Sequence, residues 1–139
     1  MQSLLFAYGT LMPSVAMRMG RPERARLARQ SSPLGGASMQ GRLYDLGQYP
    51  GLTLSDHRDD VVHGELLELS DPAATLRWLD AYEGIVPGDH EHNAYVRLLC
   101  PVVRPDAGAC EAWVYVYKGD LSRVRRIEDG RWPPTEGAQ

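Results

Sequence analysis

The hydrophobic pattern of the chain predicts several buried or half-buried strands. An apolar run at residues 3–8 ends at a glycine, and residues 61–69 form a second clear strand with Gly64 as a possible bulge. Residues 95–103 and 111–117 have the pattern of long strands joined by a turn of Pro, Gly and Asp, which predicts a hairpin. Along the second hairpin strand, aromatic residues alternate with valines, so one of its faces belongs to the core.

One segment has the pattern of an α-helix. It begins at Asp71 and Pro72, because Ser70 or Asp71 can cap a helix and proline fits the first turn. Apolar residues then recur at helical spacing, and Gly84 is a natural stop signal. The sequence therefore predicts a helix whose last turn carries Glu83.

The remaining segments give weaker signals. Residues 14–29 contain five arginines, and internal glycine and proline limit them to at most two short helices. Residues 31–36, made of Ser, Pro, Leu and Gly, are predicted to form a loop. Short strands are expected at 41–46 and 52–54 with a turn between them, and a weak helix at 121–127.

These elements total about six strands, mostly antiparallel, and one clear helix. That pattern predicts a single α+β domain over residues 1–120 whose sheet curls into a small barrel. Residues 121–139 are expected to form a partly ordered C-terminal tail, with a loose end at Pro133 and Pro134.

Composition narrows the class of protein. The 139 residues are 43% hydrophobic and 24% charged, and the formal net charge of -3 gives no general attraction to nucleic acid or anionic membranes. No stretch of about 18 apolar residues is present and the N-terminus lacks a signal-peptide pattern, so a cytoplasmic location is the expectation. In such a compartment Cys100 and Cys110 are expected to be buried or half-buried thiols rather than a disulfide.

Glu83 is the first candidate for chemistry. The last turn of a helix carries partial negative charge, so a carboxylate there is disfavoured by roughly 0.3–1 kcal/mol. The same field, together with any burial, raises the carboxyl pKa and makes it a better proton acceptor near neutral pH. Taken by its position alone, a solvated glutamate beside a capping glycine is the commoner explanation.

Tyr8, Gly9, Thr10 and Leu11 form the second candidate. A strand that stops at a glycine can turn sharply, and its successive amide groups can then bind an anion or a developing oxyanion. An ordinary strand-to-loop turn is the simpler alternative. The aromatic face that includes Tyr115 could line a pocket, where a tyrosine hydroxyl would orient a polar ligand.

Other chemistries find little support in the sequence. The four histidines, His57, His63, His90 and His92, match no HExxH or Cys/His zinc spacing, so no metal site is predicted. The chain has no phosphate-binding glycine loop and no Gly-x-Ser-x-Gly elbow. The clustered arginines lack interleaved aromatic residues, so nucleic-acid binding is a weak third hypothesis.

Four segments in order resemble the gamma-glutamylcyclotransferase-like family, which includes the gamma-glutamylamine cyclotransferases and the avirulence-induced plant proteins. They are Phe6–Leu11, Gly41–Asp45 followed by Tyr49–Gly51, Leu79–Gly84 and Ala112–Tyr117. The resemblance covers residues 4–119. It implies a small mixed, mainly antiparallel β-barrel with flanking helices.

The resemblance also implies an activity, which is the release of 5-oxoproline from a small gamma-glutamyl amine or peptide. Glu83 would be the general acid/base, and Tyr8–Leu11 would hold the glutamyl group, largely through backbone amides. No metal or organic cofactor is expected, the partner is a small-molecule substrate, and the protein is expected to be a monomer or homodimer. A non-catalytic domain that binds a small ligand in the same pocket is the alternative.

Overall fold

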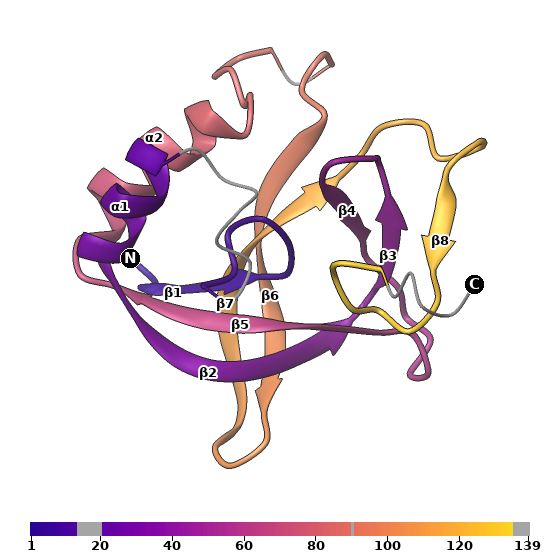
Figure 1. Cartoon of the computed structure of the whole chain (residues 1–139), viewed down its shortest axis with the longest axis horizontal. Helices are drawn as coiled ribbons and strands as arrows, with labels where there is room; N and C mark the ends of the chain where they lie inside the picture. Colours follow the sequence, from indigo (N-terminus) through magenta and orange to yellow (C-terminus); the bar gives the residue numbers. More distant parts are fainter. Residues whose placement is uncertain (14–20, 90, 135–139) are drawn as a thin grey trace.

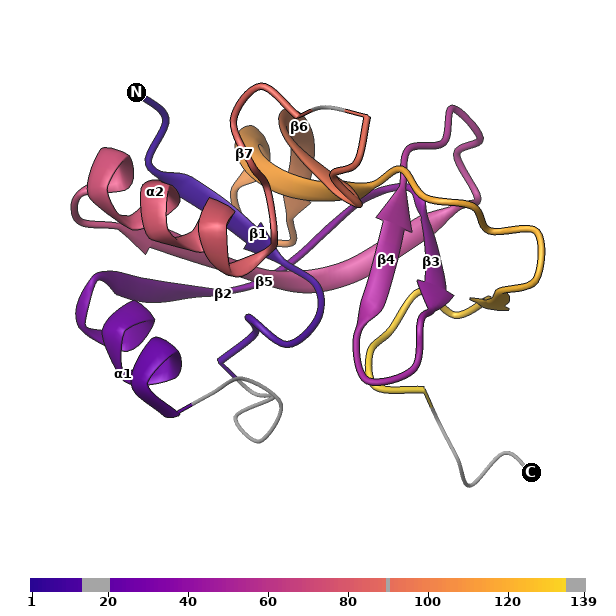
Figure 2. The same cartoon turned by 90° about the horizontal axis from the view of Figure 1, so that it is seen from above.

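The computed structural model describes residues 1–13, 21–89 and 91–134. In chain order its elements are β1 (Leu4–Ala7), α1 (Arg21–Arg29), β2 (Ser31–Gln40), β3 (Arg42–Asp45), β4 (Pro50–Thr53), β5 (Val61–Leu69), α2 (Pro72–Tyr82), β6 (Tyr95–Arg104), β7 (Gly108–Tyr117) and β8 (Arg125–Ile127). Five strands close a barrel in the order β1-β5-β2-β6-β7, and β4, β3 and β8 form a separate three-stranded sheet. Both helices lie at one end of the barrel, and the three-stranded sheet lies at the other (Figures 1 and 2).

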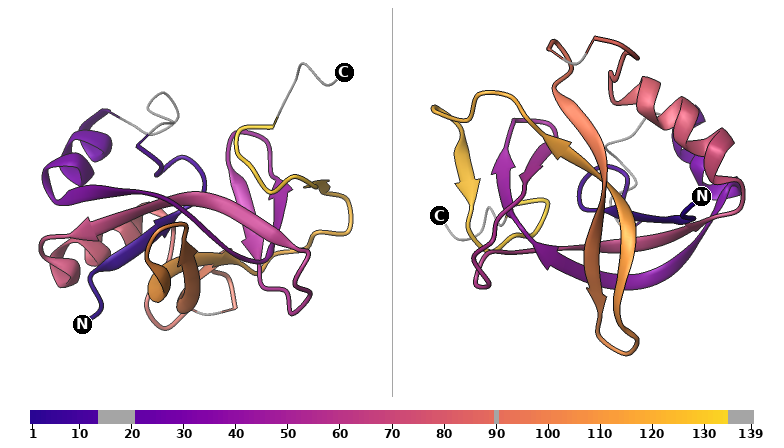
Figure 3. Two further views of the ribbon diagram at one scale, coloured as in Figure 1. Left: turned by 90° about the horizontal axis from the view of Figure 1, so that it is seen from below. Right: turned by 180° about the vertical axis from the view of Figure 1, so that it is seen from behind.

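The barrel mixes strand directions, as expected. β1 is antiparallel to β5 but parallel to β7, with Leu5 opposite Trp113, and the other pairs are antiparallel. The predicted α+β class and the mixed, mainly antiparallel barrel with flanking helices are therefore confirmed. The β6–β7 hairpin was also predicted correctly, and its tip projects beyond the rest of the barrel (Figure 3). Neither of the two described helices has the length and apolarity needed to cross a bilayer.

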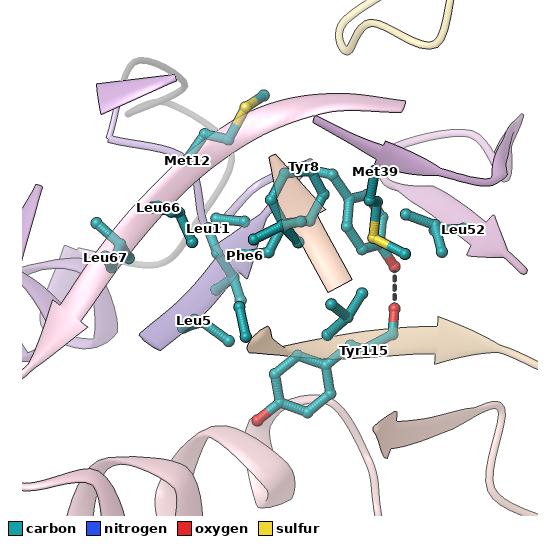
Figure 4. Packing of buried hydrophobic residues seen from close by; sticks show 14 of the residues in the cluster. Leu5, Phe6, Tyr8, Leu11, Met12, Met39, Leu52, Leu66, Leu67 and Tyr115 are labelled. Atoms are coloured by element: carbon teal, nitrogen blue, oxygen red, sulfur yellow. Dashed lines mark hydrogen bonds between the residues drawn. The ribbon is translucent and has the colours of Figure 1, made fainter. Parts of the chain in front are cut away.

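The core anchors the end of β1, where the candidate loop begins. Leu5 and Phe6 are almost fully buried, and Phe6 faces Leu66 on β5 (Figure 4). Burying a Leu or Phe side chain contributes about 1.5–3 kcal/mol, so this contact fixes β1 firmly. A Cβ atom at position 64 would lie 2.8 Å from the Phe6 ring, so only glycine allows β5 to come this close.

Two expectations around β2 were wrong. Residues 31–36 are not a loop but the first half of β2, because they pair with β5 from Ser31 opposite Leu69 onward. The bulge lies in β2, between Pro33 and Gly35, while the register runs unbroken past Gly64. Gly35 has a φ of 95°, which explains why the bulge falls beside it.

The expected weak helix at 121–127 was wrong as well. Residues Arg125–Ile127 are strand β8 and pair with β3, which raises the strand number above the six expected. Of the predicted helices in 14–29, the structure describes α1, and residues 14–20 lie outside the described part. Cys100 is buried and Cys110 half-buried, both as free thiols, as the sequence predicted.

Candidate active site

A pocket of about 520 Å³ opens where β1, the β3–β4 turn and the end of α2 meet. Its lining includes every residue that the sequence singled out for binding or chemistry: Tyr8, Gly9, Thr10, Leu11, Glu83 and Tyr115. The structure therefore brings together two segments that lie more than 70 residues apart in the chain. Their chemical roles remain predictions at this point.

Local signals place Glu83 at the end of α2. Asp71 caps the start of the helix, where its Oδ1 accepts a hydrogen bond of 3.2 Å from the Ala74 N–H. At the other end, the Gly84 N–H donates to the Ala81 carbonyl (3.0 Å) and the Ile85 N–H to the Asp80 carbonyl (2.8 Å). With Gly84 at a φ of 77°, these bonds form a Schellman motif that stops the helix at Glu83.

The environment of Glu83 favours its protonated form. Burial and, to a smaller extent, the nearby Asp80 carboxylate raise the pKa of Glu83 to about 7. In the part of the chain that the structure describes, the Glu83 carboxyl takes part in no hydrogen bond or ion pair. The carboxyl is thus poised to exchange a proton near neutral pH.

The loop after β1 is a tight turn. The Met12 N–H donates to the Gly9 carbonyl (3.0 Å), and one guanidinium nitrogen of Arg24 donates to the carbonyls of Thr10 (3.2 Å) and Met12 (3.1 Å). A Cβ atom at position 9 would lie 2.6 Å from Pro50 Cγ, so glycine is required for the loop to approach the β3–β4 turn. Arg24 lies between residues 12 and 40, where no pocket residue was predicted from the sequence.

The hydroxyls of the two predicted tyrosines are engaged with the protein itself. The Tyr8 hydroxyl donates to the Tyr115 backbone carbonyl at 2.5 Å, while the Tyr115 ring points away from Tyr8 (Figure 4). The Tyr115 hydroxyl donates to Asp80 Oδ1 at 2.8 Å. Burial is the main cause that raises the pKa of both hydroxyls. Any ligand contact by these tyrosines therefore has to share hydroxyls that already have partners.

The Tyr115 hydroxyl is held by an ion pair between Asp80 and Arg97. Arg97 donates from Nε to Asp80 Oδ1 (2.8 Å) and from Nη2 to Asp80 Oδ2 (3.0 Å). Its guanidinium lies 4.3 Å from the centre of the Trp113 ring. Sequence reasoning missed both Asp80 and Arg97. Asp80 stands three residues before Glu83, a spacing that puts the two side chains on neighbouring positions of one helix face and could have drawn attention to it.

Other pocket residues were also missed. Tyr95 lines the pocket, and its hydroxyl donates to the Pro50 carbonyl at 2.9 Å. Burial, followed by the charge of Glu83, raises the pKa of Tyr95. Gln48 and Tyr49 reach the pocket from the β3–β4 turn, and Tyr49 is half exposed at its rim. Among the described residues, no group of three or more His, Cys, Asp or Glu side chains is arranged to hold a metal, and His90 lies outside those residues.

Comparisons with known proteins identify the family of the chain. Residues 5–134 match the family model described as gamma-glutamyl cyclotransferase, AIG2-like. The chain belongs to this family. A Vibrio cholerae protein named as a candidate gamma-glutamylcyclotransferase is 33% identical over 135 residues, which cover 95% of this chain and 96% of that protein.

Solved structures of similar proteins have the same fold. The solution structure of ytfP from Escherichia coli has a TM-score of 0.63 and 28% identity, covering 98% of this chain and 99% of the other. YkqA from Bacillus subtilis has a TM-score of 0.67 and 24% identity over 95% of this chain. The match spans only 40% of YkqA, so this likeness concerns the fold of one part of that protein.

Proposed function

We propose that the protein releases 5-oxoproline from a small gamma-glutamyl amine or peptide, with Glu83 as the general acid/base. One observation carries the proposal: a carboxyl group with a pKa of about 7 lines the same pocket as the backbone turn Gly9–Leu11. Family membership supports the reaction class, because the matching family model is described as a gamma-glutamyl cyclotransferase.

The substrate supplies its own nucleophile in this reaction, so no Ser or Cys nucleophile is needed. Glu83 takes a proton from the α-amine of the glutamyl group, and the amine nitrogen then attacks the γ-carbonyl carbon. A five-membered ring forms as this C–N bond is made. The bond from the γ-carbon to the leaving nitrogen then breaks, and Glu83 returns the proton to the leaving amine.

The loop of Gly9–Leu11 serves two purposes in this proposal. Its amide groups hold the glutamyl moiety in a folded-back conformation, so that nucleophile and carbonyl meet without a bimolecular encounter. Amides near the γ-carbonyl also stabilise the negative oxygen that develops during attack. The pocket, at about 520 Å³, has room for a gamma-glutamyl group with a small leaving amine.

The test is incubation of the full chain with a panel of gamma-glutamyl amines and dipeptides, with 5-oxoproline measured by mass spectrometry. At least one panel member is expected to give product. Glu83→Gln is expected to remove that turnover, and Glu91→Gln, at an exposed position outside the pocket lining, is expected to retain it. Equal turnover by wild type and Glu83→Gln would exclude Glu83 from the mechanism.

A second measurement separates catalysis from simple binding. 5-Oxoproline and the panel compounds are added to wild-type protein in a thermal-shift assay. A ligand-dependent rise in Tm accompanied by product formation supports the enzyme. A rise in Tm with no product from any panel member supports a non-catalytic domain that binds a small ligand.

A further inference from the structure

The turn after β1 is asymmetric in its hydrogen bonds. The carbonyls of Gly9, Thr10 and Met12 all accept hydrogen bonds, the first from the Met12 N–H and the other two from Arg24. By contrast, the N–H groups of Gly9, Thr10 and Leu11 donate no hydrogen bond within the described residues. Gly9, Thr10 and Leu11 line the pocket, and Arg24 is not among its described lining residues.

Because each peptide unit is planar, the bonds that hold the carbonyls also determine where the N–H groups of the turn point. In a planar trans peptide the C=O and the N–H of the next residue point in opposite directions. The Thr10 carbonyl and the Leu11 N–H share one such plane, so Arg24, by holding the carbonyl, also fixes the direction of the Leu11 N–H. The bond from Met12 to the Gly9 carbonyl does the same for the Thr10 N–H.

We propose that Arg24 is a positioning residue that holds the Gly9–Met12 turn with its amide groups available to the ligand. Its binding role rests on the proposed function, because that function supplies the anionic groups which the amides would bind. Hydrogen bonds from a charged guanidinium are stronger than neutral ones, which suits them to hold two carbonyls against rotation. Arg24 itself touches neither substrate nor reacting atoms.

Arg24 can hold the turn because α1 is itself fixed. Gln30, which follows α1, accepts hydrogen bonds at its Oε1 from Thr75 Oγ1 (3.0 Å) and Trp78 Nε1 (2.8 Å) of α2. The Arg26 guanidinium lies 4.8 Å from the centre of the Trp78 ring. α1 therefore connects the turn on one side of the pocket to the helix that ends at Glu83 on the other.

The first test needs no ligand. Arg24→Met is compared with Arg29→Met, an exposed arginine on the same helix, and with wild type, by NMR on the full labelled chain. Without Arg24, the turn loses the two guanidinium hydrogen bonds to the Thr10 and Met12 carbonyls. The bond from the Met12 N–H to the Gly9 carbonyl then opens more often, so hydrogen exchange of this N–H is expected to accelerate by about tenfold or more. The carbonyl 13C shift of Thr10 is expected to move, while amides of β5 keep their wild-type exchange. Arg29→Met is expected to match wild type throughout.

The second test uses 5-oxoproline as the probe. Arg24→Met is expected to lower its affinity by about tenfold, and Arg29→Met by less than twofold. Unchanged Met12 exchange and Thr10 carbonyl shift in Arg24→Met overturn the positioning role, whether or not the protein turns over substrate. If wild type neither binds the probe nor makes product, the proposed function fails, but the exchange measurement still decides the role of Arg24. Should Arg24→Met not fold, Arg24→Lys is measured against the same exchange and shift criteria.

Discussion

Two carboxyl groups of this protein, Asp60 and Glu83, lie in opposite surroundings. Asp60 accepts hydrogen bonds from Arg42 (2.7 Å) and Arg126 (2.7 Å) and from the Ser55 hydroxyl (2.8 Å). Those bonds, that from Arg42 first, hold the pKa of Asp60 well below its ordinary value of 3.8. Glu83 has no such donor among the described residues, and burial raises its pKa to about 7.

The difference lies in which form of the carboxyl the fold favours. Donors directed at Asp60 favour the ionised form, which links β3, β8 and the segment before β5. Glu83 is held by backbone bonds at a helix end, while its side chain is left to face the pocket. A satisfied carboxylate is suited to holding strands together, and an unsatisfied one to moving a proton.

The largest expected effect is on kcat, which is expected to fall on substitution of Glu83 but not of Asp60. Glu83→Gln is expected to lower kcat by about 10²–10⁴-fold, the range typical of a lost general acid/base. Asp60→Asn is expected to keep wild-type kcat once the rate is divided by the folded fraction, because Asp60 does not line the pocket. Steady-state kinetics of both variants with one substrate check this. A similar fall in kcat in both variants would show that the different surroundings of Asp60 and Glu83 do not bear on catalysis.

The next effect concerns stability. Asp60→Asn leaves two arginines facing a neutral amide, so the Tm is expected to fall by several degrees. The neighbouring Asp59→Asn is the matched control, since its side chain is mostly exposed, and its Tm is expected to stay near wild type. Because the folded pKa of Asp60 lies below the unfolded value, its stabilisation is present above pH 3.8 and is lost as pH falls below that value. Thermal unfolding from pH 7 to pH 3 measures both differences.

Local sequence signals sufficed for the two halves of the candidate site. Asp71, Pro72 and Gly84 define α2 from its caps, and so predict that Glu83 ends a helix. Gly9 marks the break after β1 in the same local way. Such signals depend on residues close together in the chain, which explains their success.

Features that depend on pairing between distant segments were not predictable in this way. The Ser, Pro and Gly residues of 31–36 favour a loop by composition, but pairing with β5 overrides that preference. Arg24 and Arg97 carry ordinary surface character in the sequence, and their partners lie 12 to 17 residues away along the chain. The contacts of Arg24 and Arg97 depend on how the fold brings their partners within hydrogen-bond distance, and the sequence pattern does not predict this.

A smaller effect of opposite sign is expected from Glu83 on stability. Below pH 4.5 Glu83 is protonated in both the folded and the unfolded chain and contributes nothing. Between pH 4.5 and 7 the unfolded chain binds fewer protons than the folded one, so the free energy of unfolding falls as pH rises. Relative to Glu83→Gln, wild type is expected to lose about 1–3 kcal/mol across this interval. Urea unfolding at pH 4.5 and pH 8 gives the difference, and a gap that stays constant would contradict the raised pKa.

The finest test changes the field around Glu83 rather than Glu83 itself. Asp80→Asn removes a negative charge near Glu83 and is expected to lower the Glu83 pKa. Arg97→Met leaves the Asp80 charge without its guanidinium and is expected to raise it. The carboxyl 13C shift of Glu83 followed through a pH titration reports the pKa directly in both variants. Opposite directions identify an electrostatic cause, because loosening of the pocket by either substitution would let in water and move the pKa downward in both. A common downward shift would therefore mean that the network acts by packing, and the contrast between Asp60 and Glu83 would then rest on burial alone.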